Sequence, residues 1–307
     1  MVHDIMILGV FAADAAFRCP RLPVLGETLV GTGFQLGPGG KGSNQAIAAA
    51  RAGGDVGFIT RIGQDTFGDM GMDAWADAGV TPFVIRDPDR ATGAAGIFIE
   101  ETAGKNAIVI SPGASGAIST ADVEAQATAI AAAKVAVTQL EQPVQAARRF
   151  LDLAQAGGAA TILNPAPAAD LPQGMLALCD YITPNEEEAR ALTGIEVTDT
   201  ESATTAAAAL LAMGVRKAAI ITLGAEGALV RDAASARHIA PMSAGPVVDT
   251  TGAGDAFNGG FATGLAAGMA LDDALRFGTA VAALSVTRHG TAASMPDRAQ
   301  ITDLLAR

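Results

Sequence analysis

Short apolar runs alternate with alanine-rich segments along most of this chain of 307 residues. The runs are rich in Val, Ile and Leu and have the length of buried strands; they lie at 4–10, 56–62, 135–140, 160–163, 181–183 and 218–223. Apolar residues at helical spacing occupy segments between them, including 42–52, 121–132 and 144–156. A chain that alternates strand and helix in this way forms right-handed crossovers over a parallel sheet. The pattern predicts a three-layer α/β/α fold with a mostly parallel central sheet.

Two regions break this alternation. Residues 11–40 contain Pro20, Pro23 and several glycines without a helical period, and residues 93–111 (GAAGIFIEETAGKNAIVIS) have the pattern of two strands around a turn. Together they predict a small β-sheet lid beside the main sheet. From Gly254 onward the pattern is nearly all helical, and neither an internal repeat nor a linker occurs. We therefore expect a single domain over residues 1–307.

Composition and charge narrow the classes of partner. Hydrophobic residues make up 50% of the chain and aromatic residues only 4%, which suits helices packed tightly on a sheet. The formal net charge of −12 argues against nucleic acid and anionic membrane surfaces. No uninterrupted apolar stretch of about 18 residues occurs, and Asp4 precedes the first apolar run where a signal peptide carries basic residues. Cys19 and Cys179 have no metal-ligand spacing, so we expect reduced thiols and a cytoplasmic protein.

The first glycine-rich motif is GPGGKGSNQA, at residues 37–46. It contains a GxGxxG match, but a dinucleotide fingerprint should follow the first strand directly, and this one does not. It is not a Walker A loop either, because Gly42 stands where Ser or Thr must follow Lys41. The turn brings backbone N–H groups, Lys41 and Asn44 to the start of a helix. That arrangement suits a polyhydroxylated or anionic ligand, or is merely the entry to the helix.

The second motif, DTTGAGDAFNGG, begins at Asp249 and opens another helix. Gly252, Ala253 and Gly254 allow successive backbone amides to converge at the helix N-terminus, where phosphate oxygens are favoured. Asp255 has two interpretations. It is either the N-cap of the helix, or a general base facing a substrate hydroxyl beside a bound phosphate.

Two further segments carry polar residues after predicted strands. In TPNEEEARALTG, Asn185 and Glu188 have the spacing to share one helical face, and their oxygens suit Mg²⁺, usually through its water molecules. The alternative is an acidic helix start that faces solvent. In ITLGAEGALV, Thr222 and Gly224 lie at the C-terminal end of a strand, where open α/β sheets bind ligands.

GPGGKGSNQAIAAARAGG and DTTGAGDAFNGGF, in this order, resemble the paired signatures of the PfkB, or ribokinase-like, carbohydrate kinases. The segments LEQP, LNPAPA, TPNEEEARALTG and ITLGAEGA extend the resemblance over essentially the whole chain. The resemblance implies a three-layer α/β domain with a β lid. It also implies transfer of the γ-phosphoryl group of Mg-ATP to a sugar hydroxymethyl group, with D-ribose and ribose 5-phosphate as the leading substrate and product.

The resemblance also implies roles for individual residues. Asp255 is the expected base, and the amides of Gly252, Ala253 and Gly254 are the expected anion hole for the γ-phosphoryl group. The expected sugar-binding residues are Asp255, Asp14, Gly40, Lys41, Asn44 and Glu141. The expected nucleotide-binding residues are Asn185, Glu188, Thr222, Gly224 and Gly227, with Asn185 and Glu188 near Mg²⁺ through water. The expected K⁺ loop, acting largely through backbone carbonyls, comprises Asp249, Thr251, Ser285, Arg288, Gly290 and Ser294.

One position departs from the pattern of the resemblance. Ribokinase-like chains carry Asn two residues before the sugar-binding Asp, whereas this chain has Ala12 there. A lost hydrogen bond costs about 0.5–1.5 kcal/mol, so the sugar is either ribose with a water in the gap or another sugar, as in a fructokinase-like enzyme or a kinase of a modified ketose. From other classes, a catalytically silent sugar- or nucleotide-binding sensor and an NAD-dependent dehydrogenase stay open. The edges of the lid strands need covering, which predicts a homodimer.

Overall fold

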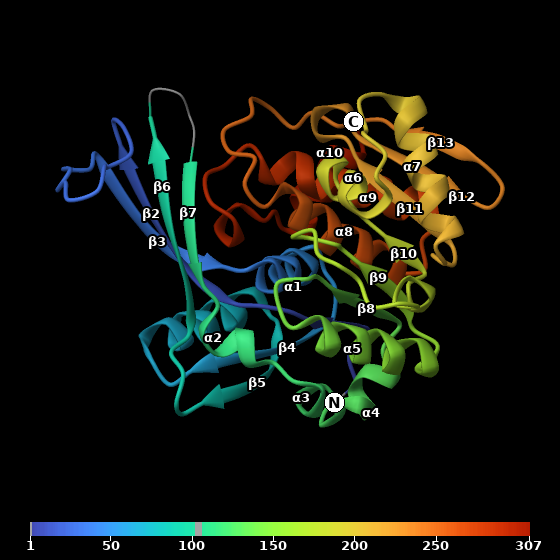
Figure 1. Ribbon diagram of the computed structural model, residues 1–307. Helices are drawn as coiled ribbons and strands as arrows, with labels where there is room; N and C mark the ends of the chain where they lie inside the picture. The colour runs from blue at the N-terminus through green and yellow to red at the C-terminus, as the bar shows by residue number, and fades with distance from the viewer. Residues whose placement is uncertain (1, 102–105) are drawn as a thin grey trace.

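The computed structural model describes residues 2–101 and 106–307, and within these ranges nine strands form the main sheet (Figure 1). From one edge to the other the strands are β13 (Ala236–Ile239), β12 (Ala228–Asp232), β11 (Ala218–Thr222), β10 (Tyr181–Ile182), β9 (Ala160–Leu163), β8 (Val135–Thr138), β1 (Ile5–Leu8), β4 (Val56–Gly63) and β5 (Thr81–Asp87). All neighbouring pairs from β11 to β5 are parallel, while β12 is antiparallel to both of its neighbours, β11 and β13. The prediction of a mostly parallel central sheet is confirmed.

Alternate residues of the strands point to opposite faces, as the strand period requires. In β1, Ile5 and Ile7 enter one hydrophobic core, whereas Met6 and Leu8 enter another on the other face of the sheet. The helices on the Ile5 face are α1 (Lys41–Arg51), α2 (Thr66–Ala78), α8 (Ala253–Ala266), α9 (Leu271–Ser285) and α10 (Arg298–Leu305). The helices on the other face are α3 (Thr120–Glu124), α4 (Ala127–Ala131), α5 (Val144–Gly157), α6 (Glu186–Thr193) and α7 (Thr200–Ala212). The three-layer α/β/α prediction is therefore also confirmed.

Two details differ from the sequence prediction. The helix expected over residues 121–132 is wrong as a single element, because it breaks into α3 and α4 at Ala125 and Gln126. The N–H of Gln126 bonds to the carbonyl of Val123 in a tight turn instead of continuing the helix. Alanine content favours a helix but does not say where tertiary contacts interrupt it. The strands β5 and β13 were not predicted, because their half-buried and exposed residues weaken the apolar signal. Strand β12 was also missed, although Ala228, Leu229 and Val230 are buried.

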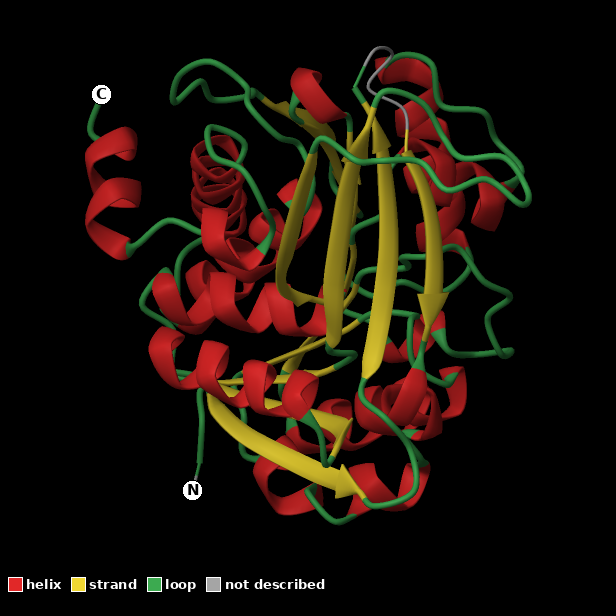
Figure 2. Ribbon diagram, turned by 90° about the vertical axis from the view of Figure 1, so that its left-hand side faces the viewer, coloured by secondary structure: helices red, strands yellow, loops and turns green. Residues whose placement is uncertain are grey.

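A second sheet of four strands stands beside the main body in the order β3 (Gly33–Gly39), β2 (Ala12–Cys19), β6 (Gly93–Glu100), β7 (Asn106–Ser111), and its strands lie side by side in Figure 2. These strands come from the two regions, 11–40 and 93–111, that broke the alternation in the sequence. The turn expected within 93–111 includes residues 102–105, which lie outside the described residues. Phe17 is paired in register with Phe34 and Phe98, so one face of this sheet is aromatic. Asp14 lies on the opposite face.

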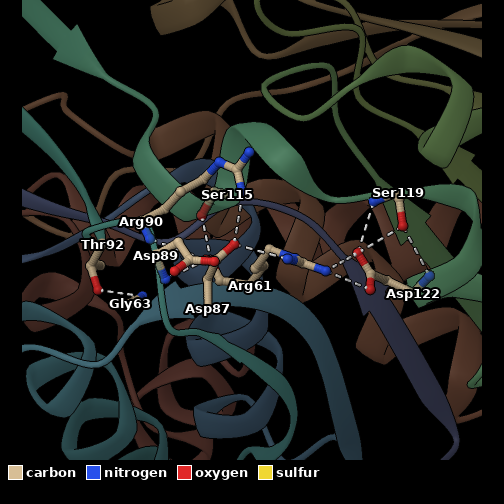
Figure 3. A network of polar contacts seen from close by, with 9 residues as sticks. All are labelled: Arg61, Gly63, Asp87, Asp89, Arg90, Thr92, Ser115, Ser119 and Asp122. Carbon is tan, nitrogen blue, oxygen red and sulfur yellow. Dashed lines mark hydrogen bonds and ion pairs between the residues drawn. The ribbon is translucent and has the colours of Figure 1, made fainter.

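An ion-pair network fastens the base of the second sheet to the main body (Figure 3). The guanidinium of Arg61 in β4 lies 2.9 Å from a carboxylate oxygen of Asp87 and 2.9 Å from one of Asp122 in α3. Backbone N–H groups of the turn after β5, together with Arg61, hold the pKa of Asp87 at about 2. In the segment that leads into β6, the hydroxyl of Thr92 accepts the N–H of Gly63 at 2.8 Å. The connection between the two sheets is therefore a fixed, hydrogen-bonded turn.

Both glycine-rich motifs start helices that meet beside the C-terminal ends of the central strands. Gly40 precedes α1 with φ 85°, and Gly252 precedes α8 with φ 78°, conformations that side-chain-bearing residues rarely adopt. Helices α1 and α8 pack against each other, so their N-terminal turns face the same region. None of the described helices has the length and apolar character needed to cross a membrane.

Candidate active site

The N-terminus of α8 and the C-terminal ends of β9, β10 and β11 enclose a cavity of ≈ 170 Å³. Ligands of open α/β sheets bind at this end of the strands. Eight of the residues singled out in the sequence line the cavity: Lys41, Asn185, Glu188, Thr222, Gly252, Ala253, Gly254 and Asp255. The chain thus brings the starts of three helices, α1, α6 and α8, to one opening.

The loop before α8 lines this cavity with backbone and little else. A Cβ atom built on Gly254 would meet nothing within 4 Å, so its position faces open space. The N–H of Ala253 donates to the carbonyl of Thr250 at 3.2 Å, so this one of the three expected amides closes a turn. The positive end of the α8 dipole and the remaining amides favour an anion here.

Asp255 is not the N-cap of α8, so that interpretation is wrong. Gly252 is the N-cap, and the Asp255 side chain instead crosses to helix α1. One carboxylate oxygen accepts the amide N–H of Asn44 at 3.1 Å and the other accepts that of Gln45 at 3.0 Å. Burial raises the pKa of Asp255, against the opposing effects of Lys41 and the two amide donors. With 6% of its surface exposed, Asp255 is a buried carboxylate at the wall of a polar cavity.

Asn44 offers a free acceptor beside this carboxylate. A carboxylate can only accept, so the contact with Asp255 fixes which end of the Asn44 side chain is the N–H₂ group. The Oδ1 atom of Asn44 is then buried without a hydrogen-bond partner among the described residues. An unsatisfied buried carbonyl is costly in the free protein, and a ligand hydroxyl would satisfy it. This residue therefore fits a polyhydroxylated ligand.

The expected sugar-binding residues Asp14, Lys41, Glu141 and Asp255 form a cluster of charged groups that influence one another. The carboxylate of Glu141 accepts the backbone N–H of Lys41 at 2.8 Å, just after the N-cap Gly40. Burial raises the pKa of Glu141 to about 7, although Lys41 opposes the shift. Burial and the charge of Asp255 raise the pKa of Asp14 to about 6. Burial lowers the pKa of the Lys41 ammonium, but the surrounding carboxylates outweigh it and raise the pKa overall.

This cluster predicts a pH dependence of stability. Because the folded-state pKa of Glu141 lies above its ordinary value of 4.5, its contribution to stability is complete below pH 4.5 and is lost as the pH rises through about 7. We expect the free energy of unfolding of Glu141→Gln to fall less over this interval than that of the wild type. Urea denaturation at a series of pH values measures the difference. Glu196→Gln, at an exposed position, is the control, and parallel pH profiles for wild type and Glu141→Gln would contradict the prediction.

Asp14 faces a second cavity, of ≈ 270 Å³, between the second sheet and the loops around residues 249–251 and 290–293. Asp249, Thr251 and Gly290 also line it. Ala12, where the resemblance calls for Asn, is buried in β2 between its register partners Gly39 and Gly93.

The expected nucleotide residues divide into two groups. Asn185 is the N-cap of α6 and forms a reciprocal capping box with Glu188, in which each side chain accepts the other's backbone N–H. Thr222 forms a bridge with Asn185 and lines the same cavity. The helix-start interpretation and the ligand interpretation of this motif are therefore compatible. Gly224 and Gly227 lie farther along, in the turn after β11.

Oxygen donors at the cavity wall fit a hydrated Mg²⁺ ion. Asn185 and Glu188 both line the cavity, and the capping box uses one Glu188 oxygen, Oε2. Burial raises the pKa of Glu188, while the Asn185 N–H and Lys41 oppose the shift. Carboxylate and amide oxygens with room for water are the ligands that Mg²⁺ favours.

The residues of the expected K⁺ loop come from two segments that the structure brings together. The carboxylate of Asp249 accepts the N–H of Thr251 at 2.9 Å and that of Gly290 at 3.1 Å, which links the two loops. The hydroxyls of Ser285 and Ser294 donate to nearby backbone carbonyls, and Arg288 lies in the turn after α9. Main-chain carbonyls of such loops are suitable oxygen ligands for a monovalent cation.

Several polar residues at the site were missed in the sequence. Asn164, Thr183 and Asn258 line the cavity, and Gln45 contacts Asp255 from behind. Asn164 directly follows the predicted strand 160–163, Thr183 is the last residue of the predicted strand 181–183, and Gln45 adjoins Asn44 in the first motif, so their positions carried a signal. The sequence did not show that these residues contact one another.

Fold and site together define a class of carbohydrate kinase, and the chain belongs to the pfkB family: residues 2–298 match the model described as pfkB family carbohydrate kinase. Among named relatives, a ribokinase of Haemophilus influenzae is 39% identical over 306 residues, 99% of each chain. A deoxyribokinase of Salmonella typhi is 33% identical over 307 residues, again 99% of each chain. The structure of Arabidopsis thaliana ribokinase complexed with ribose and ATP matches with a TM-score of 0.92 and 30% identity, over 100% of both chains.

Proposed function

We propose that the chain is an ATP-dependent sugar kinase that converts D-ribose and ATP to ribose 5-phosphate and ADP. The observation that carries this proposal is the buried Asp255 carboxylate, held by Asn44 and Gln45 at the wall of a cavity that the 252–254 backbone also lines. Family membership and the full-length similarity to ribokinases support it.

In the proposed reaction, the sugar lies between the two cavities and presents its hydroxymethyl group to Asp255. Asp14, Gly40, Lys41, Asn44 and Glu141 bind the other hydroxyls, and the free Oδ1 of Asn44 accepts one of them. Asp255 takes the hydroxymethyl proton while the oxygen forms a bond to the γ-phosphorus of ATP. The bond from that phosphorus to the bridging oxygen breaks, and ADP leaves with the electron pair. The amide N–H groups of Gly252 and Gly254 stabilise the charge on the transferring group, while that of Ala253 closes its turn.

We assign the nucleotide to the side of the cavity formed by Asn185, Glu188, Thr222, Gly224 and Gly227. Asn185 and Glu188 would hold Mg²⁺ through water, and the ion would neutralise phosphate charge. The K⁺ ion would lie beside the 252–254 backbone, held by Asp249, Thr251, Ser285, Arg288, Gly290 and Ser294. The direct link from Asp249 to Thr251 supports a coupling between cation binding and the conformation of that backbone.

We also propose that the second sheet is a lid and a dimer interface. Its outer face carries Phe17, Phe34 and Phe98 in contact, and Phe34 is 62% exposed. Exposed apolar surface of this kind on a sheet is typical of an interface between subunits. Sedimentation of the purified chain, beside a Phe34→Ser variant, tests the homodimer. The buried, unpaired Cys19 and Cys179 support the proposed cytoplasmic location.

A coupled ADP-release assay over pentoses, 2-deoxyribose, hexoses, ketoses and nucleosides tests the proposed reaction. We expect turnover with ribose and a higher rate when K⁺ is present. Turnover with another sugar but not with ribose would reject the ribose assignment and leave the kinase chemistry standing. No ADP release with any sugar would instead favour a silent sugar- or nucleotide-binding sensor.

The residue at position 12 is the reason for including 2-deoxyribose in that assay. Ala12 lacks the side-chain amide that the family pattern places there, and the chain is 33% identical to a deoxyribokinase. A sugar that lacks one hydroxyl would not leave a polar group unpaired at this position. 2-Deoxyribose is therefore the alternative substrate that the site favours.

A further inference from the structure

Behind Asp255, buried polar side chains form a closed circuit of hydrogen bonds. Gln45 Nε2 donates to Asp255 Oδ1 at 3.0 Å and to Asn164 Oδ1 at 3.1 Å. Asn164 Nδ2 donates to the carbonyl of Thr183 at 3.0 Å, and the Thr183 hydroxyl donates to Asn258 Oδ1 at 2.7 Å. Asn258 then donates to the carbonyl of Gly254 at 2.8 Å, one residue before Asp255. We call Gln45, Asn164, Thr183 and Asn258 the amide circuit.

The circuit leaves Gln45 no freedom to turn. Both of its side-chain N–H bonds are used, and its carbonyl accepts the amide N–H of Gln139 at 2.6 Å. Gln45 and Gln139 have no exposed surface, so water cannot replace these contacts. Reversing the amide of Gln45 would place its oxygen against two acceptors, the carboxylate of Asp255 and Oδ1 of Asn164. The hydrogen-bond directions around the circuit are therefore set by chemistry as well as by packing.

The circuit joins the two parts of the site that must act together. One end of the circuit holds the Asp255 carboxylate, and the other end holds the carbonyl of Gly254 in the 252–254 backbone. The links come from α1, from the ends of β9 and β10, and from α8, so a shift of any of these elements would strain the circuit. A fixed relation between base and anion-binding backbone is what phosphoryl transfer requires, because its rate depends on alignment.

We infer that Gln45 is a positioning residue for phosphoryl transfer, which through the amide circuit holds the Asp255 carboxylate in register with the 252–254 backbone. This inference rests on the proposed kinase function. Gln45 is absent from the lining of both cavities, so it acts through Asp255 and not on the substrate.

The test compares Gln45→Met with Gln142→Met in the purified full chain. Gln142 is 3% exposed and donates to Thr138 and to the backbone of Gln139, outside the circuit, so it is the same substitution in an equally buried place. We expect Gln45→Met to lower kcat by about 10- to 100-fold, since misplacing a catalytic group by about 1 Å costs about this much. We expect KM values near those of wild type. Loss of a donor to the carboxylate should also move the acid limb of the kcat profile to higher pH.

A second variant keeps the inference testable if Gln45→Met does not fold. Thr183→Val breaks the circuit on the far side of Asn164 and leaves both donors to Asp255 in place. It should lower kcat without moving the acid limb, and the double variant should lose less than the product of the two single effects, because both act through one circuit. Unchanged kcat in Thr183→Val and in Gln45→Met, or equal effects in Gln45→Met and Gln142→Met, would overturn the inference. The wild type is assayed first with its best sugar, so a wrong sugar is recognised separately.

Discussion

Replacing Asp255 by Asn is expected to lower kcat by about 10²- to 10⁴-fold, the range over which a positioned general base acts. An amide cannot take the hydroxymethyl proton, and its N–H₂ group would face the N–H donor of either Asn44 or Gln45. That buried conflict between donors also lowers the free energy of unfolding, by about 1–3 kcal/mol. We assign the nucleotide to the other side of the cavity, so we expect that ATP binding does not weaken.

The measurement combines steady-state turnover with ATP titration by calorimetry. Asp180→Asn is the matched control, because Asp180 is 3% exposed and pairs with Lys217, outside the residues that line the two cavities. It should lose stability without a comparable loss of kcat. Near-normal turnover by Asp255→Asn would reject the assignment of Asp255 as the base.

Replacing Gly259 by Ala is expected to damage both stability and turnover. A Cβ atom there would lie 2.6 Å from the Cβ of Ala48 and 2.8 Å from the carbonyl oxygen of Gln45. These are backbone or backbone-attached atoms of α1, so no flexible side chain can move aside. Overpacking of this kind costs about 1–3 kcal/mol. It outweighs the gain of about 1 kcal/mol that Ala brings to a helix.

The expected loss of turnover follows from the same close packing of α8 against α1. Asp255 lies on α8 and its two amide donors lie on α1, so pushing the helices apart lengthens the contacts that hold the carboxylate. Chemical denaturation and kcat are measured together. Gly254→Ala is the stability control, since a Cβ atom there would meet nothing within 4 Å. If the free energy of unfolding of Gly259→Ala equalled that of the wild type, the close packing of α1 on α8 would be contradicted.

Much of the architecture was predictable because its signals are local. The strands β1, β4, β8, β9, β10 and β11 coincide with apolar runs, and both glycine-rich motifs precede helices as expected. The break between α3 and α4 was not predictable, because alanine favours helix on either side of it. The edge strand β13 was missed, since an edge strand needs fewer apolar residues than a buried one. Strand β12 lies inside the sheet and was missed although Ala228, Leu229 and Val230 are buried.

In the candidate site, too, some features were predictable from the sequence and others were not. The motifs named Lys41, Asn44 and Asp255, which lie in or next to a glycine-rich turn, but not Gln45 and Asn258 in the same two motifs. They could not say that Asp255 turns away from its own helix, because the alternative N-cap role uses the same residue at the same helix end. The choice depends on Gln45, which lies 210 positions away in sequence and 3.0 Å away in space.

By itself, the sequence determined the alternation of strands and helices, the two helix starts with their glycines, and the family signatures. These depend on periodicity and on neighbouring residues. The tertiary structure decided how the carboxylates influence one another, which amides hold Asp255, and how the amide circuit closes. The physical reason is that pKa values, burial and hydrogen-bond direction depend on distances between groups from different elements, and only the folding of α1 against α8 sets those distances.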